Sequence, residues 1–334
     1  MRRYAPVLVL AILSTFVGEV LLGATTVSRI GGLLVVTPLY GGGAVLIREL
    51  ARRRGPGWGR IVLLAAAYGI VEEGLAIQST FNPDLFNAGI LGGRLFGVNW
   101  VWSQWTIGYH IVWSISIPIL LVELLFPARL AEPWLGRTGL AIAAGVYAIG
   151  ALAVAAIFRL VIAPDFRAPA ALMIGAALVA AALAALALLW PSARAAGSSA
   201  APVRNVPSPW LVGLLVFLVA GAWSALIGLP LELRTGALVL APMLAEIALA
   251  ASAVALLRRW SASPGWSDLH RLAVACGALL VSMLVGFLFV TAGNPIDQLG
   301  QGIASIITMA LLALFARRLQ RRGRVNAEIA PQRA

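Results

Sequence analysis

Three ionisable side chains lie in apolar stretches where a membrane would exclude charge. Glu72 and Glu73 are adjacent in one apolar stretch, and His110 lies in the next. A carboxyl group removed from water can act as a general base near neutral pH, and an imidazole beside it can orient water or stabilise an oxyanion. The same groups could carry a proton through a membrane. Their residue types therefore indicate either hydrolysis or proton transfer.

These side chains share a predicted depth. Glu72 and His110 each lie nine residues from the outer end of their apolar stretch, and Glu246 lies ten from the outer end of its own. A helix rises 1.5 Å per residue, so all three lie about 13–15 Å below the outer boundary. Consecutive antiparallel helices are usually neighbours, which favours contact between Glu72 or Glu73 and His110. Adjacent residues point about 100° apart, so the two glutamates cannot face one small site equally.

Three functions remain open at this point. In an intramembrane hydrolase of membrane peptides, Glu72 or Glu73 would activate water and His110 would assist. In a proton-coupled transporter or permease for a small molecule, Glu72 and Glu73 would bind the proton. The path of that alternative would include three further polar residues: Glu246, Ser114 and Tyr68. In a non-catalytic subunit of a membrane complex, the same groups would only hydrogen-bond neighbouring helices.

Other polar residues indicate structural roles. Glu19 and Glu123 lie near the ends of apolar stretches, where they are expected to reach water. His270, beside Asp268 and Arg271, is expected at the solvated inner edge of the membrane. The triplet Gly41-Gly42-Gly43 could break a helix and expose backbone dipoles, but close helix packing is the favoured interpretation.

The composition predicts a membrane protein. Of 334 residues, 61% are hydrophobic and 11% are charged, and the mean hydropathy is +0.93. A soluble domain carries about 25% charged residues, so this chain could not cover a water-facing surface of its own size. The net charge of +12 is carried by arginines in short clusters between apolar runs, which is typical of membrane topology and not of nucleic-acid binding. The single cysteine, Cys276, excludes an intrachain disulfide.

We predict an all-α polytopic bundle of about ten transmembrane helices. A bilayer core of about 30 Å needs about 20 apolar residues in a helix. With the amino terminus in the cytoplasm, twenty arginines lie on the inner side and five on the outer side. Both termini are therefore expected on the cytoplasmic side of the plasma membrane. The predicted spans are 5–23, 30–47, 61–81, 101–126, 139–160, 170–190, 210–229, 236–257, 271–292 and 302–316.

One transmembrane domain, 1–316, is expected, with a basic cytoplasmic tail at 317–334. A Pro/Ser/Ala-rich linker, 191–209, separates the first six helices from the last four. The expected partners are the bilayer and, at the basic inner loops and tail, anionic lipid; no nucleic acid is expected. The chain has no P-loop, G-x-S-x-G, H-E-x-x-H or Cys/His cluster, so no cofactor and no metal are predicted.

Around the paired glutamates the chain resembles the CAAX-protease and bacteriocin-processing family of intramembrane proteases. Glu72-Glu73 matches the start of that family's Glu-Glu-x-x-x-Arg motif, and His110 on the next helix resembles its Phe-x-x-x-His motif. Ile77 stands at the arginine position and Thr106 at the phenylalanine position. The resemblance covers residues 60–125 and implies a glutamate-dependent peptidase. Segments V-E-E-G-L and H-I-V-W-S are also similar to an uncharacterised class of bacterial ten-helix membrane proteins.

Overall fold

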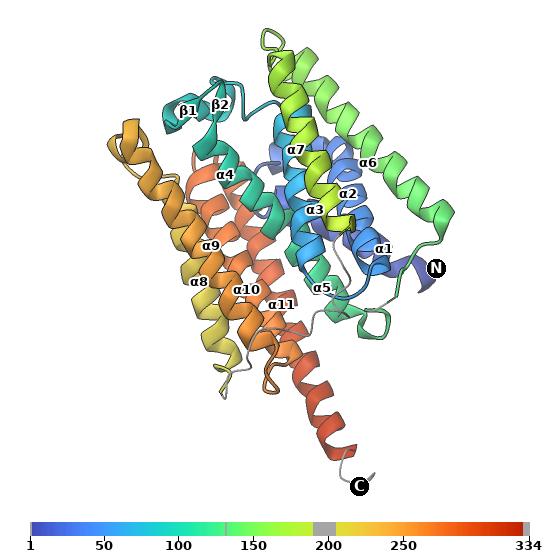
Figure 1. Cartoon of the computed structure of the whole chain (residues 1–334). Helices are drawn as coiled ribbons and strands as arrows, with labels where there is room; N and C mark the ends of the chain where they lie inside the picture. The colour runs from blue at the N-terminus through green and yellow to red at the C-terminus, as the bar shows by residue number, and fades with distance from the viewer. Residues whose placement is uncertain (1, 131, 190–204, 330–334) are drawn as a thin grey trace.

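The protein, described here as a computed structural model over residues 2–130, 132–189 and 205–329, is a helical bundle (Figure 1). Helices α6 and α7 pack on α2 and α3 along one side, while α8 packs on α10 and contacts α9 on the other. The α-helices are α1 (Ala5–Thr15), α2 (Leu33–Arg53), α3 (Gly59–Ile70), α4 (Trp100–Tyr109), α5 (Ile117–Leu125), α6 (Arg137–Ile157), α7 (Ala170–Leu189), α8 (Pro209–Leu226), α9 (Leu240–Ser261), α10 (Asp268–Val285) and α11 (Pro295–Ile329).

Eight helices of the described residues are long and apolar enough to cross a membrane. Two further helices coincide with predicted spans. Ala5–Val20 is shorter than the others, and Gly59–Ala76 carries Arg60 and the paired glutamates. The predicted linker lies mostly outside the described residues. Helix α11 continues without interruption to Ile329, past the predicted end of the last span at residue 316 and into the predicted tail.

Helix α2 is continuous across its glycine triplet, so the alternative of a broken helix does not match the structure. A β-carbon at Gly41 would lie 2.8 Å from Ala11, one at Gly42 would lie 2.9 Å from the Tyr147 backbone, and one at Gly43 would lie 2.6 Å from the Tyr68 ring. These approaches are closer than a β-carbon tolerates. The glycines therefore let α1, α6 and α3 pack directly against the α2 backbone.

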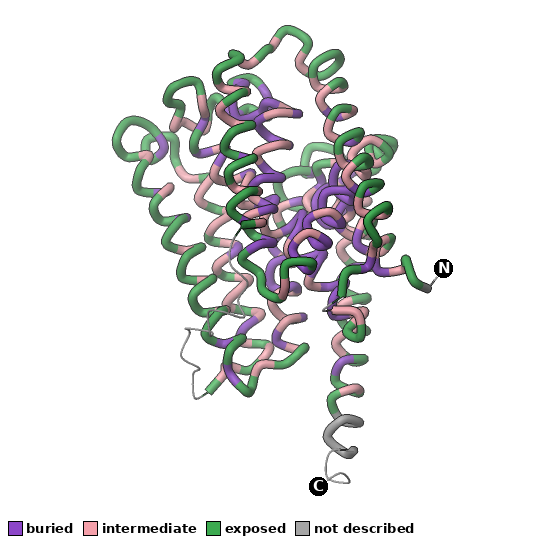
Figure 2. Tube along the Cα trace, turned by 45° about the vertical axis from the view of Figure 1, so that its right-hand side comes forward, coloured by how far each residue is buried: buried purple, intermediate pink, exposed green. Residues whose placement is uncertain are grey.

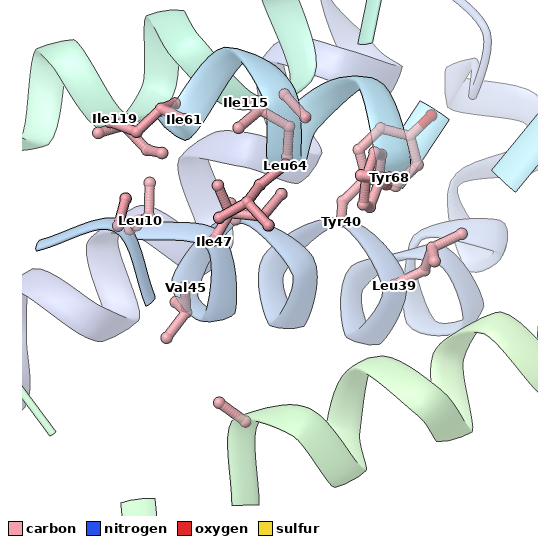
Figure 3. Packing of buried hydrophobic residues seen from close by; sticks show 14 of the residues in the cluster. Leu10, Leu39, Tyr40, Val45, Ile47, Ile61, Leu64, Tyr68, Ile115 and Ile119 are labelled. Carbon is pink, nitrogen blue, oxygen red and sulfur yellow. The ribbon is translucent and has the colours of Figure 1, made fainter. Parts of the chain in front are cut away.

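One central helix, built from α4, a π-helical segment at His110–Ser116 and α5, is shared by two hydrophobic cores. Ile115 and Ile119 pack with α1, α2 and α3, as Figure 3 shows. Tyr109 and Trp113 pack with α8 and α10. Buried residues accordingly concentrate in the middle of the bundle, and exposed residues lie mostly at its periphery (Figure 2). The middle of this shared helix is therefore removed from both water and lipid.

A short outer loop sets the start of this helix. Strands β1 (Arg94–Leu95) and β2 (Val98–Asn99) pair antiparallel through a two-residue turn. Phe96 and Gly97 both have positive φ in that turn, as a tight hairpin with the twist of its strands requires. The Asn99 side chain then accepts from the Trp102 backbone N–H at 2.9 Å, which is an N-cap. The cap fixes where α4 begins and hence the height of His110.

Candidate functional site

Three π-helical segments meet in the middle of the bundle, and each carries polar residues. Phe16–Val20 contains Glu19, Val71–Ala76 contains Glu72 and Glu73, and His110–Ser116 begins at His110. A π-helical turn adds one residue to the turn and changes the direction of its side chains; such turns are rare and occur frequently at functional sites. We call Glu19, Glu72, Glu73 and His110 the carboxyl–histidine cluster.

His110 lies between the two paired glutamates. Its Nε2 is 3.0 Å from Oε1 of Glu73, and its Nδ1 is 3.4 Å from Oε2 of Glu72. Nδ1 also forms a 3.0 Å hydrogen bond with the Ser114 hydroxyl, one turn further along the same helix. Glu72, Glu73 and His110 are 2%, 6% and 3% exposed. The structure thus brings together the three residues that were predicted to meet from their depth and their consecutive helices. The prediction that the two glutamates could not share one small site is wrong, because the π-helical turn at Val71–Ala76 changes the direction of their side chains and both reach the same imidazole.

Glu73 is held in place by Ser79 and Trp102. The Ser79 hydroxyl donates to Oε2 of Glu73, and the Trp102 indole N–H donates to Ser79 at 2.9 Å. Trp102 belongs to α4, so the same helix supplies both His110 and the support of its carboxyl partner. Each Glu73 oxygen therefore has a polar contact.

Glu72 is less completely satisfied. Its other close neighbour is Tyr68, one turn earlier on α3. Neither the Tyr68 hydroxyl nor Oε2 of Glu72 has a regular hydrogen bond among the described residues, although both atoms are buried. Oε2 of Glu72 has its 3.4 Å contact with His110, but a contact of that length is weaker than a regular hydrogen bond. This side of the imidazole is therefore where the cluster retains unused hydrogen-bonding capacity.

Glu19 completes the cluster, and its predicted exposure to water is wrong. Its side chain is 8% exposed, accepts from the Thr25 hydroxyl at 2.6 Å, and lies near enough to His110 and Glu73 to interact with their charges. The chain turns back at Gly23, which has φ +78°, and this turn covers the helix end. The signal in the sequence was a glutamate inside a predicted span, and the reversal that buries it was not foreseen.

Glu246 lies outside this cluster. Its Oε2 accepts from Gln104 at 2.7 Å, and the same amide donates to the Met243 carbonyl at 2.9 Å. Glu246 is thus bonded to α4 through Gln104, and the same amide of Gln104 also joins α4 to the α9 backbone. Of the residues predicted for a proton path, Ser114 and Tyr68 contact the carboxyl–histidine cluster, and Glu246 does not.

A second group of buried charges lies at the end of the bundle that is predicted to be the inner one, where Glu123 was predicted to reach water. That prediction is wrong, since Glu123 is 3% exposed and makes a bidentate pair with Arg52, with both N–O distances 2.7 Å. Arg48 and Glu49 are fully buried and pair at 3.0 Å. We call these four residues the inner network.

The prediction for His270 is also wrong. It is 6% exposed, bonds Ser267 through Nδ1 at 2.8 Å and the Pro207 carbonyl through Nε2 at 2.9 Å. It stacks on Trp266 with ring centroids 5.0 Å apart. His270 therefore caps the start of α10, which is a structural role.

The charge balance of the cluster is unusual for a buried site. Its carboxyls come from three glutamates, and the cation paired with two of them is His110. The ion pairs that arginines make among the described residues involve four other acids, namely Glu49, Glu123, Glu132 and Asp268. Three carboxylates and one imidazolium would leave two uncompensated negative charges in the core. Burying unpaired charge is costly, so the cluster is built to hold protons or to receive a cationic partner.

The fold and the site define a polytopic integral membrane protein with an ionisable cluster inside its helical bundle. A family model described as an uncharacterized membrane protein family matches residues 8–322. The chain belongs to this family, as the similarity to an uncharacterised membrane class predicted. No curated protein and no solved structure matches the chain. The resemblance to CAAX proteases receives no support from these comparisons.

Proposed function

We propose that the protein is a proton-coupled membrane transporter in which the carboxyl–histidine cluster binds and releases the coupling proton. The observation that carries this proposal is the position of His110 between Glu72 and Glu73, with Glu19 close by. Intramembrane ionisable residues that contact one another are typical of proton relays. The proposal includes the predicted topology of ten spans with both termini inside.

The surplus of carboxyls supports proton binding. A proton added to one glutamate lowers the buried negative charge by one, and the imidazole can pass a proton between Glu72 and Glu73 because its two nitrogens face different acids. The Ser114 hydroxyl on Nδ1 can donate or accept. It can therefore follow either imidazole tautomer without a change in the backbone.

The hydrogen-bond pattern argues against a purely structural role. Polar side chains that only join helices are expected to satisfy one another, whereas the Tyr68 hydroxyl and Oε2 of Glu72 are buried without regular hydrogen bonds. A proton moving to Glu72 would supply a donor beside that hydroxyl. We therefore interpret the missing regular hydrogen bonds of Tyr68 and Glu72 as the state in which Glu72 carries no proton.

An intramembrane hydrolase is the second candidate, because one specific arrangement favours it. His110 contacts a carboxylate through Nε2 and a hydroxyl through Nδ1, so Glu73 and His110 could together activate water as a general base. Hydrolysis also requires a peptide bond to reach these atoms, and each of these side chains is at most 6% exposed. Proton binding requires no such access, and for this reason we rank transport first.

The test is transport by the purified chain in sealed vesicles containing a pH-sensitive dye. Candidate small molecules are added under an imposed pH gradient, and proton movement that depends on the solute is recorded. We expect Glu73→Gln and His110→Ala to abolish this movement, since the first removes a carboxyl that can bind a proton and the second removes the imidazole that contacts it. Membrane-peptide cleavage that is lost in the same variants, without solute-dependent proton movement, would favour the hydrolase and reject transport.

Glu246→Gln is the matched control. It removes a buried carboxyl that lies at the predicted depth of Glu72. This carboxyl bonds Gln104 on α4 and is not part of the carboxyl–histidine cluster. We expect its proton movement to remain near that of the wild type. An equal loss in Glu246→Gln would show that the cluster is not the specific proton site.

A further inference from the structure

A cavity at the inner end of the bundle lies apart from the carboxyl–histidine cluster. It measures about 680 Å³ and is formed by the end of α2, the turn that follows it, α5 and the start of α10. Its charged lining consists of four arginines and one glutamate: Arg52, Arg53, Arg54, Arg271 and Glu123. Its apolar lining is supplied by Leu120, Leu124, Leu130, Pro56 and Trp58.

The single acid of this cavity is already paired. Glu123 accepts both bonds of the bidentate contact with Arg52 and a further bond from Arg48 at 3.3 Å. The remaining Arg52 nitrogen donates to the Gly57 carbonyl at 3.0 Å. Arg52 therefore joins the cavity floor to the turn and is a positioning residue. The positive charge considered for a ligand is that of Arg53 and Arg271, each of which contacts one acid through one nitrogen: Glu49 at 3.7 Å and Asp268 at 3.3 Å.

Arg53 and Arg271 present that charge to solvent. Their side chains are 29% and 42% exposed. Arg53 donates to the Leu135 carbonyl, and Arg271 contacts Asp268 at 3.3 Å through one nitrogen. A guanidinium has five N–H donors, so one or two contacts leave capacity for a phosphate, which arginine binds in a bidentate manner. The two side chains reach the cavity from different helices.

The turn beside the cavity requires glycine at two positions. Gly55 and Gly57 have φ of +110° and +115°, a conformation that L side chains rarely adopt. A β-carbon at Gly57 would meet nothing within 4 Å, so glycine is required there by the backbone conformation and not by crowding. Trp58 follows directly and is 39% exposed, as indoles at a membrane–water interface often are.

We infer that this cavity binds a phosphate group, as carried by the headgroup of an anionic phospholipid. Basic pockets between transmembrane helices on the cytoplasmic side are suited to such headgroups, and the leucines and Trp58 would contact the first carbons of the lipid. Arg53 and Arg271 bind the phosphate, and Arg52 holds the turn. Free inorganic phosphate has the same chemistry and would use the same arginines.

The test uses the full chain purified in neutral detergent, with thermal unfolding measured against added phosphatidylglycerol, phosphatidylcholine or inorganic phosphate. We expect phosphatidylglycerol to stabilise the protein and phosphatidylcholine to have no effect. The double variant Arg53→Gln/Arg271→Gln should bind at least about tenfold more weakly, since it loses charge-assisted hydrogen bonds. If inorganic phosphate reproduces the stabilisation and the variant weakens it equally, the site is supported and its ligand is the free ion.

The matched control is Arg317→Gln/Arg318→Gln, which removes the same charge from exposed positions of α11 outside the cavity. An equal weakening in this control would mean diffuse attraction between a basic protein and an acidic lipid, and the inference would be overturned. Leu120→Trp is a second variant, which fills the cavity and keeps all four arginines. Wild-type affinity in Leu120→Trp would also overturn it. Neither outcome depends on the function of the carboxyl–histidine cluster.

Discussion

The inner network and the carboxyl–histidine cluster are both buried groups of charge, but they are built differently. In the inner network two arginines balance two glutamates, Arg48 also donates to the carbonyls of Arg129, Leu130 and Glu132, and its guanidinium lies 3.6 Å from the Trp134 ring centroid. In the carboxyl–histidine cluster one imidazole contacts two carboxyls, those of Glu72 and Glu73, and the third carboxyl, that of Glu19, lies near them. The first region is neutral and saturated with hydrogen bonds, while the second has acids in excess.

We interpret the difference as one between charges that hold the fold and charges that, under the proposed function, bind a proton. Glu49 accepts from the backbone N–H groups of Trp134 and Leu135 at 2.8 and 3.1 Å, so the inner network fixes the loop between α5 and α6. The carboxyl–histidine cluster can gain or lose a proton without losing its framework, because its helices are packed by apolar residues around it.

The largest expected effect is the loss of stability on breaking the inner network. Glu49→Ala leaves Arg48 buried without its carboxylate and removes the acceptor of two backbone N–H groups, so we expect the free energy of unfolding to fall by about 3–5 kcal/mol. Denaturant unfolding in detergent would measure it. The control is Glu132→Gln, which breaks an exposed pair with Arg129 and should cost at most about 1 kcal/mol. Similar losses in the two variants would contradict the structural role of the network.

The second effect tests the packing beneath the cluster. A β-carbon at Gly18 would lie 2.5 Å from the Tyr40 ring and 3.1 Å from the Ser114 hydroxyl. Gly18→Ala should therefore destabilise the protein by about 1–3 kcal/mol and displace the hydroxyl that bonds His110. Gly145→Ala is the control, because a β-carbon there meets nothing within 4 Å. Equal stability of the two variants would contradict this prediction and show that Tyr40 and α2 shift to make room for the added β-carbon.

The smallest expected effect on stability comes from the cluster itself. Glu73→Gln keeps the shape of the side chain and lets the amide bond His110 and Ser79, so we expect a change of at most about 1.5 kcal/mol in the free energy of unfolding. The same variant should abolish proton movement. A loss as large as that of Glu49→Ala would place Glu73 among the structural charges and remove the contrast between the two regions.

The sequence predicted the helical membrane class and the meeting of three residues because both depend on local quantities. Apolar length identifies a span, and a residue count along a helix gives the height of Glu72 and His110. The glycine triplet of α2 could also be interpreted, since small residues have a packing role wherever helices cross. These inferences need no knowledge of which helix lies beside which, apart from the two that are consecutive.

The residues that the sequence placed wrongly depend on contacts between distant segments. Glu123 is buried because Arg52, 71 residues away in the chain, reaches it. Glu19 joins the cluster because the chain reverses after its helix, and Glu246 stays out because α9 packs at the edge of the bundle, next to α8. The π-helical turns had no signature in the apolar pattern. Depth alone could not separate Glu72 from Glu246, since equal height says nothing about which helices are neighbours.

The central claim is that the carboxyl–histidine cluster holds an exchangeable proton inside the membrane. Infrared spectroscopy tests it directly, because a protonated carboxyl has a carbonyl stretch that a carboxylate lacks. We expect the wild type at neutral pH to show this band, with a shift in deuterated water, and we expect Glu72→Gln and Glu73→Gln each to alter it while Glu246→Gln leaves that component in place. A spectrum in which neither Glu72→Gln nor Glu73→Gln changes the protonated-carboxyl band would contradict the account.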